Sequence, residues 1–337
     1  MSLKKHFYLK HNKMDYKQYN NELIFPEFNT IKVSTKTFIV MTNLHINIKS
    51  LFNYLPITDF VLIPKRRGRK KKCETVDPNK DIISGSIITL EFENEDIRGV
   101  DLKKKKNLKS KKRGSYFRNA VTVVMIIDNK KINFKISCNG HFQITGCKNT
   151  AHAATCVKYI WGYIENSTDI YTIKDNELIV TFIPAMRNID FNIGFNIDRE
   201  KLDEYINTKT PYNSLLETSF GYTGVNIKFP IENDINTLQL KQIKFINNQW
   251  VDGFVVPFQY YLDTLKDKER AKKIKKERFN TFLVFHSGKA ILSGINAEFQ
   301  IKSYLSFLNI IRDCYSIIKE EIIYIEKKKK KIKKIKN

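Results

Sequence analysis

The 337-residue sequence has no run of 18 or more apolar residues, so we expect no transmembrane helix and no membrane partner. Residues 1–13 are polar and basic without an apolar stretch, which argues against a secretory signal. The five cysteines are scattered and form no pair of Cys-x-x-Cys motifs, so neither a disulfide framework nor that type of zinc site is expected. This usage favours a reducing, intracellular compartment and no bound metal.

Catalytic signatures are also missing. The chain has six histidines, no His-Glu-x-x-His motif, no phosphate-binding Gly-Lys-Ser/Thr loop and no clustered carboxylates beside a Gly-rich turn. We therefore expect no enzyme activity and no cofactor. An enzyme such as a glycosylase or ribonuclease on the scaffold described below is the alternative, and measurable cleavage or base excision would support it.

Positive charge is abundant and concentrated. The net charge is +24, and 31 of the 59 lysines and arginines lie in four runs that contain only three acids. The runs are Lys65–Lys72, Lys103–Arg113, Lys266–Arg278 and Lys327–Lys336. Solvated loops and tails are one interpretation of such runs. The other is attraction to a polyanion, most simply a nucleic acid.

One motif occurs twice, 148 residues apart. Residues 138–147 read CNGHFQITGC, and residues 286–295 read HSGKAILSGI. An apolar run precedes each copy, and a long amphipathic stretch follows each (Thr150–Ile164 and Ala297–Ile311). Strand, Gly turn, strand, Gly and helix in two copies indicate a duplicated fold.

The rest of each half fits an antiparallel sheet backed by a long helix. Strands are expected at Lys36–Ile48, Gly85–Phe92, Asn119–Ile127, Ile132–Ser137, Leu178–Ile183, Asn188–Ile197, Gly224–Phe229, Phe279–Phe285 and Ala290–Ser293. Asp198–Ile206 is expected to be helical, with Asp198 as its N-cap. Met41-Thr-Asn43-Leu and Met186-Arg-Asn188-Ile also echo each other.

This pattern resembles the TATA-box-binding protein family. The family signature is an apolar strand, Ser-Gly-Lys, two or three apolar residues, then Thr-Gly. Residues 282–294 (FLVFHSGKAILSG) are close to it, and residues 140–146 (GHFQITG) are looser. Gly221–Lys228 is similar to the family's Phe-Pro-Gly-Leu-Ile-Tyr-Arg strand, and Thr42-Asn43-Leu44 to its Val-Asn-Leu.

The resemblance implies an α+β fold of two pseudo-symmetric repeats, each a curved antiparallel sheet backed by helices, which together form a saddle with basic insertions. We expect a polar N-terminal arm at 1–34, a first repeat at 35–170 with an insertion at about 64–113, and a second repeat at 171–318 with an insertion at about 230–278. A Lys-rich tail occupies 319–337. Residues 250–261 are too aromatic for a free linker, so we expect them to pack on the domain or bind a partner.

The implied chemistry is minor-groove binding. Such a protein lays its concave sheet on AT-rich double-stranded DNA and wedges aromatic side chains between base steps, which bends the duplex. The wedge positions fall on Phe285, Tyr222 and Phe117, with Arg118 a one-residue alternative to Phe117. Small polar groups at Thr145, Ser293, Asn188 and Asn43 match the groove floor, although strict alignment puts Thr37 in place of Asn43. His141, Lys228 and Lys289 match rim positions that face phosphate.

Each assignment has a structural alternative: the phenylalanines as core residues and the small polar residues as ordinary strand positions. The inner wedge of the first repeat falls on Ser137, which cannot intercalate, and Phe134 is out of register. The Arg67-Gly68-Arg69 sequence resembles an AT-hook core but lacks the proline that normally follows. A solvated loop or a nuclear-import signal would explain it equally well.

The resemblance implies a transcription initiation factor that bends promoter DNA and recruits a factor IIB-like protein and RNA polymerase. The composition and divergence suggest a large DNA virus, with action in the host nucleus or a cytoplasmic virus factory and packaging in the virion as a further option. The alternative is a protein-interaction scaffold with weak or non-specific DNA binding, because Ser137 and the enlarged loops depart from the family.

Overall fold

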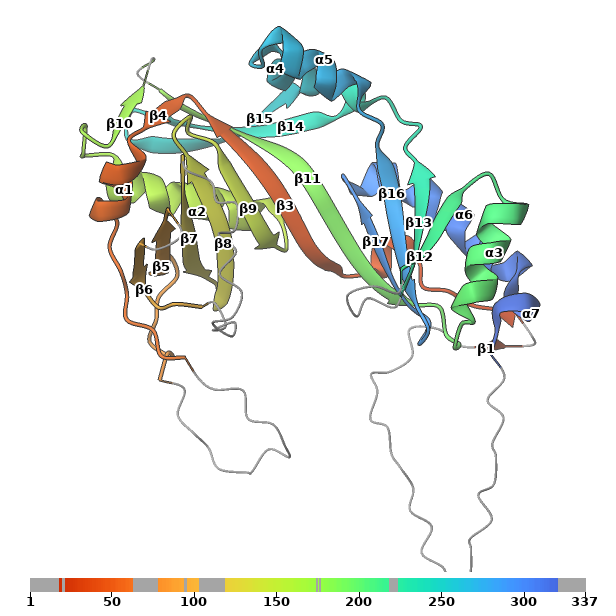
Figure 1. The fold of residues 1–337 in the computed structure, drawn as a ribbon. Coiled ribbons are helices and arrows are strands. Elements are labelled where there is room, and N and C mark those ends of the chain that lie inside the picture. Colours follow the sequence, from red (N-terminus) through yellow and green to blue (C-terminus); the bar gives the residue numbers. More distant parts are fainter. Residues whose placement is uncertain are drawn as a thin grey trace, which may run out of the picture.

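A computed structural model describes residues 18–19, 22–62, 78–93, 96–102, 119–173, 175, 177–217 and 224–320. These residues form a mixed α+β structure dominated by one antiparallel sheet of thirteen strands (Figure 1). None of the helices in these ranges is long and apolar enough to cross a membrane.

The first half of the sheet carries two helices. Its elements are β3 (Val33–Thr42), β4 (Leu44–Ile46), α1 (Ile48–Tyr54), β5 (Ile87–Phe92), β6 (Asp96–Gly99), β7 (Ala120–Ile127), β8 (Lys130–Ser137), β9 (Phe142–Cys147), α2 (Thr150–Ile164) and β10 (Tyr171–Ile173). β1 (Gln18–Tyr19) and β2 (Glu22–Leu23) precede them as a separate small pair. The predicted helix at 150–164 is confirmed.

The second half follows the same order but contains an additional hairpin and two helices. Its elements are β11 (Leu178–Asn192), α3 (Arg199–Lys209), β12 (Asn213–Glu217), β13 (Gly224–Pro230), β14 (Gln239–Ile246), β15 (Gln249–Pro257), α4 (Phe258–Asp263), α5 (Asp267–Lys275), β16 (Phe279–Phe285), β17 (Lys289–Gly294), α6 (Ala297–Asp313) and α7 (Tyr315–Ile318). Asp198 caps α3 as predicted, since its side chain accepts a hydrogen bond from the Lys201 N–H.

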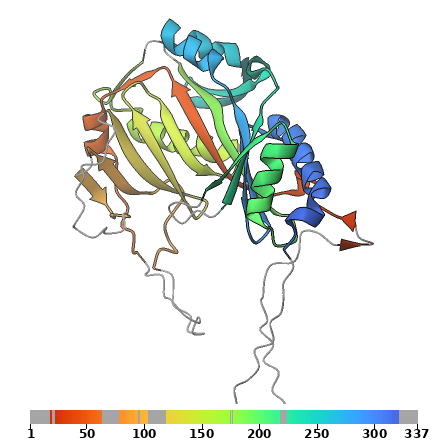
Figure 2. The same ribbon diagram turned by 45° about the vertical axis from the view of Figure 1, so that its right-hand side comes forward.

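The strand order is similar on both sides of the central pair β11–β3, and β6 is an additional strand at the edge of the first half. The order runs β12-β13-β16-β17-β11-β3-β9-β8-β7-β5-β6, and the hairpin β14–β15 joins β11 beyond the end of β17. In Figures 1 and 2 the sheet curves strongly, with α2 outside one half and α3, α6 and α7 outside the other.

The duplicated motif forms the same turn in both halves. Gly140 and Gly288 have positive φ angles of 68° and 74°, and their N–H groups bond to Ser137 and Phe285, each at 3.0 Å. A Cβ atom at either glycine would lie within 2.4 Å of a backbone oxygen of the neighbouring segment. Only glycine therefore fits both turns.

The helix that follows each turn also starts in the same way. Asn149 and Asn296 are the N-caps of α2 and α6, and their side chains accept hydrogen bonds from His152 N–H and Phe299 N–H, each at 2.9 Å. Both caps are extended, with φ of −144° and −146°. The paired helix starts explain why two distant sequences have one local structure.

The helices bury one face of the sheet. In the second half, Phe282 of β16 stacks on Phe307 of α6 with ring centroids 4.2 Å apart, and both side chains are fully buried. In the first half, Phe134, Phe142 and Ile144 pack in the cluster that contains the apolar face of α2. Each fully buried side chain of this size contributes roughly 1.5–3 kcal/mol relative to exposure.

The opposite face of the sheet is called the inner face below. Side chains alternate along a strand, so Asn188 and Asp190 point away from the helices that Ile189 and Phe191 contact. By this alternation and the strand register, the inner face comprises Thr35, Thr37, Ile39, Met41, Ile183, Met186, Asn188, Asp190, Asn192, Leu215, Asn226, Lys228, Thr281, Leu283, Phe285, Lys289, Ile291 and Ser293, with Thr122, Val124, Ile126, Asn133, Lys135, Gln143 and Thr145 in the first half.

One expectation about the chain path was wrong, and two further features were not expected. The strands predicted at 178–183 and 188–197 are one strand, β11, which continues through an irregularity between Pro184 and Met186. The N-terminal segment is not an irregular arm throughout, because Phe25 and Phe28 are buried in the core of the second half. The first half also extends past 170, since β10 pairs with β4.

Two segments cover part of the inner face. Phe258, Tyr261 and Leu262 of α4 are buried against Met41 and Ile183, which confirms that the aromatic stretch at 250–261 packs on the domain. In the first half, Ile88, Val124 and Ile126 are covered by Phe60, Ile82 and Leu102. The open part of the inner face therefore lies mainly in the second half.

Candidate nucleic-acid interface

A row of polar residues crosses the open inner face. Thr35, Asn188, Ser293, Thr281 and Lys228 are successive cross-strand partners on β3, β11, β17, β16 and β13. Side chains opposite one another in an antiparallel sheet are close enough to act together. The row provides a hydroxyl, an amide, two further hydroxyls and an exposed ammonium group in a line across five strands.

The adjacent row is apolar in its middle. Ile291, Leu283 and Asn226 are successive partners, with Asp190 at one end and Leu215 at the other. Leu215 is 64% exposed, and Ile291 and Leu283 are half-buried. Together the two rows form a floor of flat apolar side chains bordered by small hydrogen-bonding groups.

Two amides on this floor have unsatisfied oxygen atoms. The Oδ1 atoms of Asn188 and Asn226 are buried and have no hydrogen-bond partner among the described residues. A buried polar atom without a partner costs free energy. The unpaired oxygens are acceptors, whereas the Nδ2 groups of the same amides are the donors that a ligand with acceptor atoms would need. Asn188 was predicted from the sequence as a floor residue, and the structure does place it on the inner face.

Of the predicted wedges, only Phe285 lies among the described residues. It ends β16, is half-buried and pairs with Gly224. Ser137 occupies the corresponding place at the end of β8, opposite Ala120, so the two halves differ here as the sequence indicated. Phe117 and Tyr222 lie outside the described residues, as do Arg118 and the AT-hook-like residues Arg67, Gly68 and Arg69.

One residue predicted for the floor, Asn43, lies elsewhere in the structure. Asn43 follows β3, where its side chain bonds to the Glu177 carbonyl and the Ile179 N–H at 2.8 and 2.9 Å, so it joins two strand ends and is not part of the floor. Because Asn188 pairs with Thr35 while Met186 pairs with Thr37, the residue that corresponds to Asn188 is Thr37. The echo between the two Met-x-Asn sequences was therefore out of register.

Thr145 and Ser293, two of the residues that the resemblance assigns to the groove floor, both lie on the inner face. The Thr145 hydroxyl is exposed and donates a hydrogen bond to the Asn133 carbonyl at 3.0 Å. Ser293 is half-buried beside Thr281. At the rim, Lys228 and Lys289 are exposed, and Lys289 follows Gly288 just as His141 follows Gly140.

His141 is a poor match for a phosphate-binding position at neutral pH. Burial lowers its pKa below the usual value, and the nearby Glu269 opposes this shift to a smaller extent. The imidazole is therefore mainly neutral at pH 7 and brings no positive charge to the rim. The loss of charge reinforces the difference between the two halves.

Replacing His141 with glutamine should flatten the dependence of stability on pH. Because the pKa of His141 is lower when folded, the unfolded chain takes up more protons as the pH falls below its ordinary value of 6.5. The free energy of unfolding should therefore fall between pH 7 and pH 5 in the unmodified protein, and fall less in His141→Gln. Urea unfolding at both pH values measures this; an equal effect from His45→Gln, an exposed control, would contradict it.

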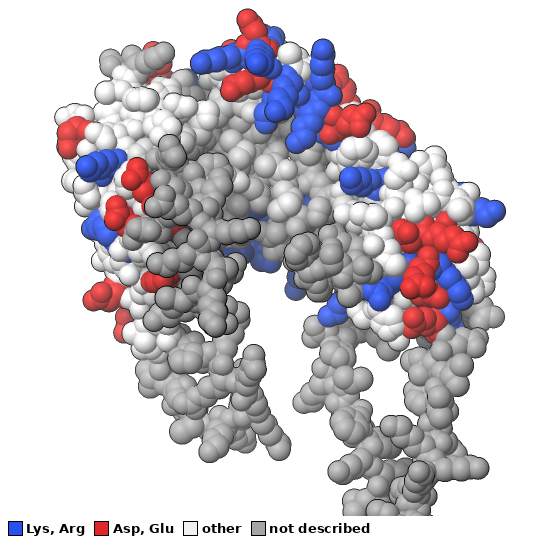
Figure 3. All heavy atoms as spheres, viewed as in Figure 1, with Lys and Arg blue, Asp and Glu red and all other residues white. Residues whose placement is uncertain are grey.

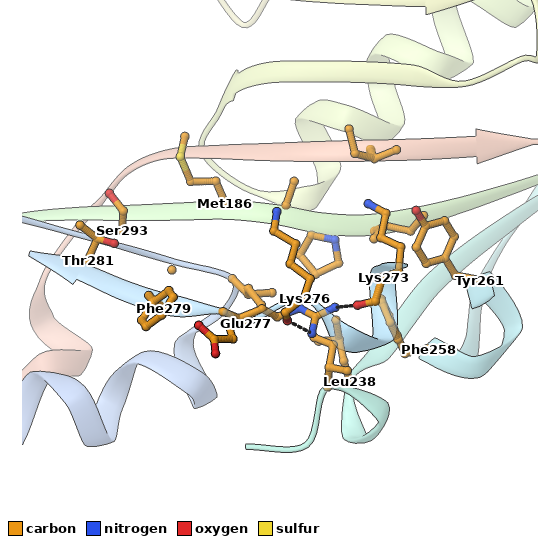
Figure 4. A pocket seen from close by; sticks show the side chains of 18 of the residues that line it. Met186, Leu238, Phe258, Tyr261, Lys273, Lys276, Glu277, Phe279, Thr281 and Ser293 are labelled. Atoms are coloured by element: carbon orange, nitrogen blue, oxygen red, sulfur yellow. Dashed lines mark hydrogen bonds between the residues drawn. The ribbon is translucent and has the colours of Figure 1, made fainter. Parts of the chain in front are cut away.

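A cavity of about 440 Å³ lies between the floor and the inserted helices (Figure 4). Its walls include Met186, Thr281 and Ser293 on the floor side and Phe258, Tyr261, Lys273 and Lys276 on the insertion side. Lys228 and Arg278 also line it, so four cations face a space with one acid, Glu277. The cavity is an electropositive groove along one edge of the open inner face.

Arg278 fixes the end of the basic helix. Its guanidinium donates to the carbonyls of Lys273 and Lys276 at 2.7 and 3.0 Å, which satisfies carbonyls at the C-terminus of α5 (Figure 4). Burial lowers the pKa of Arg278. In Figure 3, lysines and arginines gather over the inserted helices at the top of the molecule, next to a smaller acidic group.

Sequence reasoning missed Asn226, Leu283 and Ile291 as parts of this surface, and it named the basic run Lys266–Arg278 without placing it beside them. Alternation in Gly224–Pro230 was the available signal, because its apolar residues alternate with Asn226 and Lys228. The aromatic content of residues 250–261 predicted packing on the domain, but no sequence signal showed which face of the sheet the insertion covers.

No known family model matches the chain. It is 28% identical over 224 residues to uncharacterized protein 335L of Invertebrate iridescent virus 6; the match covers 64% of this chain and 66%, just under two thirds, of that viral protein. Among solved structures it is similar to TBP of Methanococcus jannaschii, with 12% identity and a TM-score of 0.40, over 84% of this chain and 98% of that chain.

Proposed function

We propose that the chain is a TATA-box-binding-protein-like transcription initiation factor that binds and bends AT-rich DNA through its minor groove. The inner face is the DNA-binding surface, and the two halves form a pseudo-symmetric saddle. The protein is a non-enzymatic viral factor that recruits a factor IIB-like protein and RNA polymerase, in the host nucleus or a cytoplasmic virus factory. The observation that carries the proposal is the floor of apolar and amide side chains beside Phe285.

This floor suits the minor groove of A·T pairs. The groove presents only acceptor atoms at such pairs, and the amide groups of Asn188 and Asn226 and the hydroxyls of Ser293 and Thr281 supply donors. Ile291 and Leu283 supply the apolar contact area. Phe285, at the end of its strand, is placed to insert between base steps and unstack them.

The charge distribution supports the same surface. Lys228, Lys273 and Lys276 line the groove at the edge of the floor, and Lys289 lies at the rim. Cations in such places hold phosphates and set the register of a duplex without reading its sequence. The net charge of +24 adds a general attraction to DNA.

The grip is uneven. The second half keeps Phe285 and Lys289, whereas the first half has Ser137 and a mainly neutral His141 in those places, and part of its inner face is covered by Phe60 and Ile82. We therefore assign most of the bending to the second half.

A duplex-bending FRET assay tests the function. Probes with an AT-rich or a GC-rich centre are titrated at fixed salt, because lysine runs alone give strong, sequence-independent binding at low salt. The expected result is tighter binding and a larger end-to-end FRET change for the AT-rich probe. Equal affinity for both probes without a bend would overturn the proposal.

A protein-interaction scaffold is the second candidate. Asp190 favours it, because this exposed carboxylate lies on the inner face next to Ile291, where it repels phosphate. The coverage of Met41 and Ile183 by α4 also narrows the surface that a duplex could reach. Under this alternative the protein still binds DNA through its lysine runs, but loss of Phe285 leaves DNA affinity unchanged.

A further inference from the structure

A second electropositive cavity lies at the irregularity in β11, beside the starts of the two long helices. It has a volume of about 180 Å³ and is lined by Lys36, Arg187 and Lys241 together with Thr150 at the start of α2 and Asn296 and Ala297 at the start of α6. Phe38 and Phe182, which belong to the helix-covered core of the first half, form part of its wall. Pro184, Met186, Leu238 and Ile295 line both this cavity and the groove of the inner face, so the two spaces adjoin at the irregularity in β11, but their cations differ.

The three cations come from three neighbouring strands. Lys36 of β3 pairs with Arg187 of β11, and Lys241 of β14 pairs with Phe182 of β11. Arg187 is only 9% exposed, Lys36 is half-buried and Lys241 is exposed. This gradient puts a buried guanidinium at the base of the cavity and an accessible ammonium at its mouth.

Carboxylates do not balance this charge among the residues that line the cavity. The nearest acid along the chain, Glu298 in the first turn of α6, is exposed and lies outside the lining. Arg187 does have neutral partners, since it donates to the Gln300 Oε1 at 2.5 Å and lies 5.2 Å from the Phe28 ring centroid. These contacts position the guanidinium but leave its charge uncompensated.

The pKa shifts of the cavity's cations also indicate that their positive charges are not neutralised. Burial lowers the pKa of Lys36, and the positive charges of Arg187 and Lys241 lower it further. Burial also lowers the pKa of Arg187. Like charges brought together out of water are costly unless an anion joins them.

The helix starts add donors to the same space. The first four N–H groups of a helix lack intrahelical acceptors, and the caps Asn149 and Asn296 each satisfy one of them. α2 and α6 have 15 and 17 residues, so both present the positive end of a substantial helix dipole. Two such ends and three cations around one small cavity form a site for a multiply charged anion.

We propose that this cavity, formed by Lys36, Arg187, Lys241 and the starts of α2 and α6, binds a phosphate group. The group is that of inorganic phosphate or of a phosphate monoester such as a nucleoside monophosphate, with the ester substituent leaving through the mouth beside Lys241. Guanidinium and helix N–H groups bind the buried oxygens, and the lysines neutralise the charge. Lys36 and Arg187 are cross-strand partners on the two central strands, β3 and β11. A bound phosphate that contacts both side chains therefore also stabilises the junction between the halves of the sheet. The site is independent of the proposed DNA binding.

Thermal unfolding of the full chain tests the site. Inorganic phosphate and adenosine monophosphate are titrated separately against sodium chloride at matched ionic strength. A ligand that binds only the folded protein raises Tm in a saturable way, whereas binding that is equal for the folded and the unfolded chain does not. We expect a saturable rise with phosphate; a stronger effect from the monophosphate identifies the ester as the ligand, and a weaker effect identifies the free anion.

Two variants and one control locate the binding. Lys241→Gln and Lys36→Gln should each weaken phosphate binding by roughly tenfold to hundredfold, as expected for loss of one charge-assisted contact. Lys228→Gln, which removes a lysine from the inner-face groove, should leave it unchanged. The same Tm rise in all three variants, a loss only in Lys228→Gln, or no rise above that of chloride would each overturn the proposal. DNA binding by the same variants is measured in a separate assay, so that a failure of either proposal can be recognised.

Discussion

Replacing Phe285 with alanine should lower the affinity for AT-rich DNA by about 1–3 kcal/mol, roughly fivefold to 150-fold, and reduce the bend. The magnitude is that of one aromatic side chain stacked on a base. Phe285 is placed for this role because it ends β16 on the inner face and pairs with Gly224, which has no side chain to shield the ring. The bend depends on the same ring, since unstacking a base step is what allows the duplex to kink.

The first half of the fold supplies a control residue for this experiment. Ser137 lies at the corresponding end of β8 and cannot intercalate, so Ser137→Ala should change neither affinity nor bend. Thermal unfolding of both variants separates a binding defect from a folding defect, because Phe285 is only half-buried. Unchanged affinity in a folded Phe285→Ala protein would favour the scaffold alternative.

The sequence predicts the repeated parts of this fold well because local chemistry determines them. The glycines at 140 and 288 are required by close backbone approach, and the long helices begin at asparagine caps and follow their apolar spacing. The same reasoning placed Phe285, Ser293 and Thr145 on strands next to these turns. The helix starts are determined by residues within about ten positions of one another, whereas the backbone atoms that crowd Gly140 and Gly288 belong to the distant residues Leu44 and Phe195.

The errors arose where residues distant in sequence determine the structure. Asn43 resembled Asn188 in sequence, yet the irregularity between Pro184 and Met186 sets the strand register and makes Thr37 the corresponding residue. The aromatic stretch at 250–261 indicated packing, but the face of the sheet it covers depends on the tertiary position of Met41 and Ile183. A one-residue change in register moves every side chain of a strand to the other face, so such assignments need the paired strands.

Neutralising Lys273 and Lys276 together should make DNA binding less dependent on salt. Both side chains line the groove beside the floor, so each is placed to contact one phosphate of a duplex on the inner face (Figure 4). Each phosphate contact adds about 0.9 to the steepness of log affinity against log salt. The double variant Lys273→Gln/Lys276→Gln should therefore reduce the slope by about 2 and weaken AT-rich and GC-rich probes equally, because phosphate contacts carry no sequence information.

Lys268→Gln/Lys272→Gln is the matched control, since these exposed lysines lie on the same helix but do not line the groove. The control variant removes the same number of charges from α5 and its C-cap. A long-range electrostatic effect would therefore lower the salt slope of both variants equally, whereas a duplex bound in the groove lowers mainly that of the Lys273/Lys276 variant. Fluorescence anisotropy at 50 to 300 mM salt distinguishes the two outcomes. If the Lys273/Lys276 variant keeps the full slope, the duplex does not pass along α5, and the inserted helices cover the inner face instead of forming a wall of the binding groove. If the slope falls by about 2, Lys273 and Lys276 both contact phosphates. The insertion that covers Met41 and Ile183 then also contributes basic residues to the edge of the DNA-binding surface.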